Sequence, residues 1–180
     1  MKSYQKVLLG LFAIMAITGC IGINIVPVDV SRQTHAVETS DGETISFNLY
    51  VKQGIPDNRP VIVMGHGVMV NKEMMTNYAI ELASRNFIVA NIDWRGHGQS
   101  TGNLDTSLLD LDLEAVISKI PLLVPSANMS ELGLIGYSMG GGPTFRYAAN
   151  HPEVKAWIGV GTNADGDIST ETNPNNLLLI

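Results

Sequence analysis

Residues 136–140, Gly-Tyr-Ser-Met-Gly, constrain the fold of this chain more than any other segment. They follow the apolar residues 132–135 and precede residues 143–150, which can form a helix, so they predict a sharp turn from a strand into a helix. A serine on such a turn crowds the positions two residues away on either side, and glycine fits there because it has no Cβ. The turn would lift the Ser138 hydroxyl clear of the sheet edge, where a base could reach it.

The rest of the chain predicts a β-hairpin followed by strands that alternate with helices. The hairpin would join residues 34–39 and 43–51 through a Ser-Asp-Gly turn. Further strands are expected at residues 60–64, 87–92, 131–135, 154–160 and from 177 onward, and helices at 72–85, 106–120 and 139–150, the first capped by Asn71. This order predicts an α/β fold: a mostly parallel sheet with helices on both faces and its chemistry at the carboxyl ends of the strands.

The N-terminus has the pattern of a secretory signal. Lys2 and Lys6 precede the almost wholly apolar residues 7–17, which end in Ile-Thr-Gly-Cys at Cys20. This ending resembles a lipobox, in which the peptide is cut before a cysteine that then carries lipid. We therefore expect a signal peptide at residues 1–19, a tether at 20–33 and a folded domain at 34–180. An uncleaved apolar anchor over residues 7–23 is the alternative, and both interpretations predict an extracytoplasmic protein held on a membrane.

The composition excludes several classes of function. The formal net charge is −6, and the sequence has no cluster of Lys and Arg residues that could form a basic patch, so the surface would repel nucleic acid. Cys20 is the single cysteine, so an internal disulfide cannot form. The three glycines at 140–142 lack the lysine of a phosphate-binding loop and the spacing of a dinucleotide site. We expect no cofactor and no metal.

Three segments together resemble the α/β-hydrolase superfamily, over residues 34–180. Residues 65–68, Gly-His-Gly-Val, resemble the His-Gly turn of the oxyanion hole. Residues 93–100, Asp-Trp-Arg-Gly-His-Gly-Gln-Ser, are similar to the D-x-R-G-H-G-x-S loop of many esterase-like members. The turn at Ser138 resembles the nucleophile elbow.

The resemblance implies roles for particular residues. Ser138 would be the nucleophile, and the backbone N–H groups of Val68 and Met139 would hold the developing oxyanion, where an aligned donor contributes about 3 kcal/mol. His66 and His97 are interpreted as structural residues of their loops. His35 and His151 are expected to lie far from Ser138.

The family order is serine, acid, histidine, but no histidine follows His151 in this chain. We therefore expect an N-terminal part of a longer hydrolase, without the C-terminal strands and helix of the family core. Asp165, with Asp167 beside it, is the candidate acid within the chain. A polar turn over residues 163–167 is the alternative interpretation, and a calcium loop is a weaker one because the spacing of an EF-hand is absent.

The sequence thus predicts a membrane-tethered serine hydrolase that acts on an ester, thioester or amide of a small acyl substrate, inactive in this chain alone. The alternative is a non-catalytic surface lipoprotein that uses a degenerate hydrolase fold for binding. The intact elbow favours the enzyme, and the missing histidine favours the binding protein.

Overall fold

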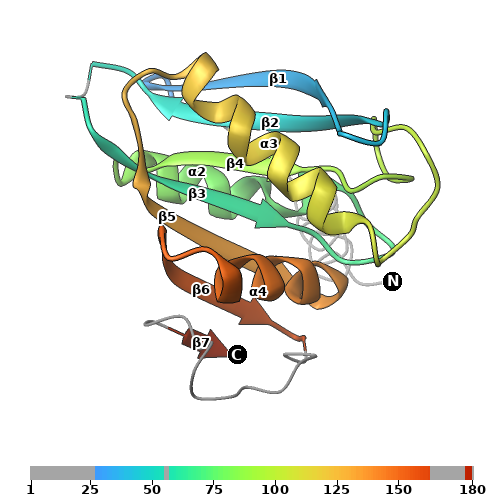
Figure 1. Cartoon of the computed structure of the whole chain (residues 1–180). Coiled ribbons are helices and arrows are strands. Elements are labelled where there is room, and N and C mark those ends of the chain that lie inside the picture. Colours follow the sequence, from blue (N-terminus) through green and yellow to red (C-terminus); the bar gives the residue numbers. More distant parts are fainter. Residues whose placement is uncertain (1–26, 55–56, 163–176, 180) are drawn as a thin grey trace, which may run out of the picture.

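A computed structural model describes residues 27–54, 57–162 and 177–179 of the chain (Figure 1). Seven strands form one sheet in the order β1-β2-β4-β3-β5-β6-β7. The strands are β1 Val30–Glu38, β2 Thr44–Lys52, β3 Arg59–Gly65, β4 Ile88–Ile92, β5 Ala127–Tyr137, β6 Val154–Val160 and β7 Leu177–Leu179. The helical segments are η1 Lys72–Met75, α2 Thr76–Ser84, α3 Leu109–Leu123, η2 Ser138–Gly140 and α4 Gly141–Asn150.

The sheet is mostly parallel, as the sequence predicts. Strands β1 and β2 form an antiparallel hairpin, and β2 pairs antiparallel with β4. From β4 through β3, β5 and β6 to β7, every pair is parallel. The parallel strands therefore end at one edge of the sheet, and the segments that follow β3, β4 and β5 meet there.

Helices cover both faces of the sheet (Figure 1). The first face carries α3 and α4, whose buried residues pack with β2, β3, β4 and β5 into the larger apolar cluster, which includes Trp94 and Trp157. The opposite face carries α2, which packs Ala79 and Ala83 against Tyr50 and Val89. The fold class is therefore confirmed: this is an α/β protein with a mostly parallel sheet.

Several element boundaries differ from the sequence expectation, four of them in an informative way. Strand β1 starts at Val30 and takes in residues 30–33, which the sequence assigned to the tether, because Val30 is buried and pairs with Lys52. The first turn of the helix expected at 72–85 is the 3₁₀ segment η1, capped by Asn71 as predicted. Helix α3 runs three residues later than predicted at each end; its later start follows a turn in which Ser107 donates to the Asp105 carboxylate. Strand β5 is longer, with a register shift where it meets β3.

Several sequence predictions fall on residues outside the described part of the chain. They are the signal peptide at 1–19, the lipidation site at Cys20 and the candidate acids Asp165 and Asp167. Among the residues that the structure does describe, no helix is both long and apolar enough to cross a membrane.

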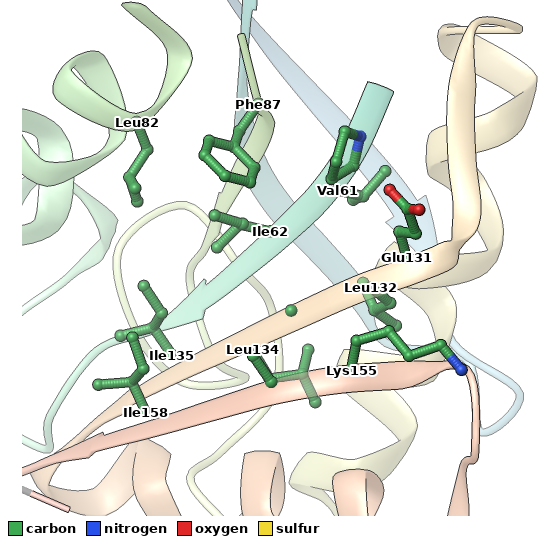
Figure 2. A pocket seen from close by; sticks show the side chains of 13 residues that line it. Val61, Ile62, Leu82, Phe87, Glu131, Leu132, Leu134, Ile135, Lys155 and Ile158 are labelled. Carbon is green, nitrogen blue, oxygen red and sulfur yellow. The ribbon is translucent and has the colours of Figure 1, made fainter. Parts of the chain in front are cut away.

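An apolar groove lies on the face that carries α2. It has a volume of about 500 Å³ and is lined mainly by apolar groups of β3, β5, β6 and the end of α2. Figure 2 shows Leu82, Phe87 and Ile62 along one side of it, with Ile135 and Ile158 facing them from β5 and β6. Helix α2 packs mainly over β2 and β4, and the groove lies beside it over β3, β5 and β6.

Candidate functional site

Ser138 lies at the turn between β5 and α4, at the carboxyl edge of the sheet. Its φ is +49°, a left-handed conformation that is uncommon and strained for a residue with a Cβ. A Cβ added to Gly136 would come within 2.5 Å of the Gly140 carbonyl oxygen. The turn is therefore too tight for a side chain at Gly136, for the reason predicted from the sequence.

The turn that carries Ser138 packs directly on the turn after β3. Strands β3 and β5 are parallel neighbours, with Gly65 opposite Gly136. A Cβ on Gly140 would lie 2.5 Å from the Gly65 carbonyl oxygen, and a Cβ on Gly67 would lie 3.2 Å from the Ser138 Cβ. The structure thus brings Ser138 against the His-Gly turn, and glycine makes this close approach possible from both sides.

His66 is fully buried and both of its ring nitrogens are engaged. Nε2 accepts a hydrogen bond from the Trp94 backbone N–H at 3.2 Å, so Nδ1 carries the proton and donates to the Gly67 carbonyl oxygen at 2.7 Å. Burial lowers the pKa of His66 to about 4. A neutral ring with both nitrogens occupied holds backbone in place and is poorly suited to take a proton from Ser138, as expected for this histidine.

The loop after β4 is fixed to the same edge by a buried ion pair. The Lys72 Nζ lies 2.5 Å from the Asp93 carboxylate, and the Lys72 backbone N–H donates to the other Asp93 oxygen at 2.7 Å. Both side chains are almost fully buried. Gly98, with a φ of +53°, passes so close that an added Cβ would lie 2.6 Å from an Asp93 oxygen. Asp93 therefore ties the loop to η1.

Arg95 joins the same loop to the first face of the sheet. Its buried guanidinium donates to Asp112 of α3 at 2.9 and 2.7 Å and to Asp41 of the hairpin turn at 2.7 and 3.1 Å. The hydrogen bond from Arg95 lowers the pKa of Asp41 to about 2, while burial raises the pKa of Asp112. The sequence analysis missed this network and the Lys72–Asp93 pair, although Asp93 and Arg95 stand in a motif that it singled out.

The remaining histidines do not contact Ser138. His97 Nε2 lies 2.6 Å from the Val68 carbonyl oxygen. His151 ends α4 and stacks on Tyr147 with ring centroids 3.7 Å apart. His35 lies in β1, the edge strand, four places from β5 in the sheet. Within the described part of the chain no histidine or carboxylate is hydrogen-bonded to Ser138, and no group of three or more His, Cys, Asp or Glu residues could hold a metal ion.

The two backbone groups expected at the oxyanion site come from the two turns. Val68 follows Gly67 in the turn after β3, and Met139 follows Ser138 in η2. No acceptor for the Val68 backbone N–H is found among the described residues. The carboxyl edge of the sheet thus offers a serine hydroxyl and the Val68 backbone N–H on two turns that touch.

Comparison with known proteins places this site in a family. The family described as serine aminopeptidase, S33, matches residues 56–178. The AB hydrolase superfamily protein YisY of Bacillus subtilis is 30% identical over 117 residues, and a monoacylglycerol lipase of Mycolicibacterium smegmatis is 28% identical over 149 residues. The alignments cover 65% and 79% of this chain, but only 40% and 51% of the two relatives.

Solved structures share the fold. A hypothetical protein from Pseudomonas aeruginosa superposes with a TM-score of 0.70 at 25% identity, over 77% of this chain and 44% of its own. The esterase Pf2001 of Pyrococcus furiosus superposes with a TM-score of 0.62 at 21% identity, over 73% of this chain and 51% of its own. With the sheet order, the helices on both faces and the family match over more than half of its length, the chain belongs to the serine aminopeptidase, S33, family of the α/β-hydrolase superfamily.

Proposed function

We propose that this chain carries the nucleophile and the oxyanion site of a serine hydrolase. The observation that carries the proposal is the contact between the two turns, where Gly67 and Gly140 leave room for Ser138 to lie against the His-Gly turn. The left-handed φ of Ser138 is a second support, because such strain persists where the surrounding structure imposes it and is concentrated at active sites.

In the proposed reaction the Ser138 Oγ attacks the carbonyl carbon of an acyl substrate, and the C=O electrons move onto oxygen. The Val68 and Met139 N–H groups donate to this oxyanion, a contribution of about 3 kcal/mol for each aligned donor. Collapse of the intermediate expels the alcohol or amine and leaves an acyl-serine, which water then hydrolyses. Aligned donors on rigid turns stabilise the transition state because they need no reorganisation.

A general base must take the proton from Ser138, since an un-ionised hydroxyl is a poor nucleophile. His66 has both nitrogens engaged, and the proton on His97 Nε2 points at a carbonyl oxygen. We therefore assign the base and its orienting acid to residues outside the described part of the chain. Asp165 stays the candidate acid within these 180 residues.

The substrate class is proposed from the relatives. Two kinds of relative bear the name monoacylglycerol lipase, one from Mycolicibacterium smegmatis and one, ABHD6, from human. A carboxylic ester of a small or medium acyl group is the corresponding proposal for this chain, with thioesters and amides as further members of the same chemistry. No nucleic acid partner and no cofactor enter the proposal.

The membrane tether is proposed from the sequence of residues 1–29 alone, since residues 30–33 belong to β1. Lipid on Cys20, after removal of residues 1–19, would hold the domain on the outer side of a membrane. Expression in a host that processes lipoproteins should yield a membrane-bound protein whose first residue is an acylated Cys20. An intact chain with an unmodified Cys20 in the mass spectrum would refute lipidation and leave the uncleaved anchor.

The test of the function is hydrolysis of p-nitrophenyl butyrate by the chain and by Ser138→Ala. We expect slow turnover, because removal of triad members elsewhere leaves only about 10³–10⁴-fold acceleration over water. Ser138→Ala should abolish whatever turnover depends on the site. If both proteins give only the rate of buffer alone, the result would favour the non-catalytic lipoprotein. The lack of a base among the described residues also supports that alternative.

A further inference from the structure

Two imidazole rings hold the two peptide units on either side of Val68. His66 Nδ1 donates to the Gly67 carbonyl, which belongs to the same peptide unit as the Val68 N–H. His97 Nε2 donates to the Val68 carbonyl at 2.6 Å, in the next peptide unit. A trans peptide unit is planar, so its carbonyl oxygen and its N–H move together, and a hydrogen bond to the oxygen restricts the directions that the N–H can take. With both planes held, the backbone dihedrals of Val68 are set.

His97 is the side chain that reaches this turn from elsewhere in the sequence. Among the described residues, no other side chain outside the turn hydrogen-bonds to residues 68–70. Val68 and Met69 are exposed, at 48% and 92% of their surface, so packing does little to fix them. His66 alone would hold the first peptide unit at one atom, its carbonyl oxygen, and both that unit and the next could then swing about the Val68 dihedrals.

The loop that carries His97 is itself rigidly attached. Its backbone is tied by hydrogen bonds from His97 N–H to the Trp94 carbonyl and from Ser100 N–H to the His97 carbonyl. Asp93, buried against Lys72, accepts the Gln99 N–H at 2.9 Å. The His97 ring also meets the His66 ring edge to face, with centroids 5.1 Å apart. Because the His97 ring is carried by a rigid loop, it can hold the exposed turn in one position.

The hydrogen bond to the Val68 carbonyl identifies which ring nitrogen of His97 contacts the turn. A carbonyl oxygen only accepts, so Nε2 must carry a proton at 2.6 Å from the Val68 oxygen. A ring with a single proton, on Nε2, cannot also donate from Nδ1 to the Arg95 carbonyl oxygen 3.2 Å away, so the contact to Val68 is the hydrogen bond of this tautomer. The contact to the turn therefore depends on Nε2.

We propose that His97 is a positioning residue: through the Val68 carbonyl it holds the turn after β3 so that the Val68 N–H points to the acyl oxygen of a substrate on Ser138. The catalytic consequence rests on the function proposed above, whereas the ordering of the turn does not. His97 touches neither substrate nor Ser138 in this role.

Three substitutions separate this role from a general loss of packing. His97→Gln places an amide N–H near the Nε2 position, His97→Asn places one near Nδ1, and His97→Ala removes both. Each is compared with the wild-type 180-residue chain by ¹⁵N relaxation of the Val68 and Met69 amides, and by kcat and KM for p-nitrophenyl butyrate. Residues of β3 serve as the internal reference for order.

We expect the order parameter of Val68 to be near 0.85 in the wild type and in His97→Gln, and to fall below about 0.6 in His97→Ala and His97→Asn, while β3 is unchanged. The same two variants should lose about 10- to 100-fold in kcat with little change in KM, because a misaligned oxyanion donor acts on the transition state. An unchanged Val68 order parameter in His97→Ala, or equal rescue by Asn and Gln, would overturn the proposal. If wild-type turnover is independent of Ser138, the proposed function fails, and the relaxation data still decide the positioning role.

Discussion

Gly140→Ala should destabilise the protein, because the added methyl group would enter the contact between the two turns. An ideal Cβ at residue 140 lies 2.5 Å from the Gly65 carbonyl oxygen and 2.8 Å from that of His66, whereas ordinary contacts begin near 3.4 Å. Both neighbours are backbone atoms, which cannot rotate away. Overpacking of this kind typically costs about 1–3 kcal/mol, and the two turns must separate by a large part of an ångström.

Gly142→Ala is the matched control, two residues further along the chain, in the first turn of α4. Its Cβ would meet only the Arg146 guanidinium at 3.4 Å, the end of a flexible side chain. Alanine is favoured over glycine in a helix by up to about 1 kcal/mol, so this variant should be more stable than the wild type. The two substitutions add the same methyl group and should change stability in opposite directions.

The measurement is the midpoint of thermal and urea unfolding of the wild type and both variants. A difference of about 2–4 kcal/mol between the variants corresponds to roughly 4–16 °C in Tm for a domain of this size. Gly140→Ala should also lose Ser138-dependent turnover, because a displacement near 1 Å can cost about 10²-fold in rate. Equal melting temperatures for the two variants would refute the close contact on which the site is built.

Three further outcomes follow from the buried groups and the groove. Asp93→Asn should lower the free energy of unfolding in urea by about 3–5 kcal/mol, because it leaves Lys72 buried without its partner. Glu81→Gln, which breaks an exposed ion pair, should lower it by less than about 0.5 kcal/mol. Equal losses of stability in the two variants would contradict the importance of the buried pair. Burial lowers the pKa of His66 from 6.5 to about 4, so the unfolded chain binds a proton more readily than the folded protein does. The free energy of unfolding should therefore fall by about 3 kcal/mol in total as the pH drops from 6.5 to 4. His66→Asn should make the free energy of unfolding less dependent on pH over this range. An apolar groove on the sheet face should favour concentration-dependent self-association, and Ile158→Thr in this groove should weaken that association in sedimentation experiments. Association that the substitution leaves unchanged would show that the groove is not the contact surface.

The strands and the elbow could be predicted because local pattern determines them. The expected strand at residues 154–160 is β6 without any change of boundary, since these residues form a largely apolar run. Glycine is expected at 136 and 140 because a side chain there would be crowded, and an added Cβ at either position would indeed strike other atoms. At Gly136 these atoms include the Gly140 carbonyl oxygen of the same turn, whereas at Gly140 they belong to Gly65 and His66, which the five residues alone do not indicate.

The Arg95 network and the early start of β1 could not be predicted, because they depend on contacts between segments that are distant in the sequence. Arg95 pairs with Asp41 and Asp112, which are 54 and 17 residues away, and no local pattern indicates which carboxylates it will find. The early start of β1 follows from the burial of Val30 against the α2 face, again a tertiary effect. Asp165 lies outside the described residues, so its role stays a prediction.

The most direct test of the central claim, that Ser138 is a nucleophile seated against the His-Gly turn, is the site and rate of its reaction with a fluorophosphonate. The Ser138 Oγ would bond to phosphorus as fluoride leaves and the hydroxyl proton passes to solvent. Peptide mass spectrometry should find the adduct on Ser138, forming slowly in the absence of a general base, and on no other serine at a comparable rate. An adduct distributed over exposed serines, with Ser138 no faster than the others, would contradict the account.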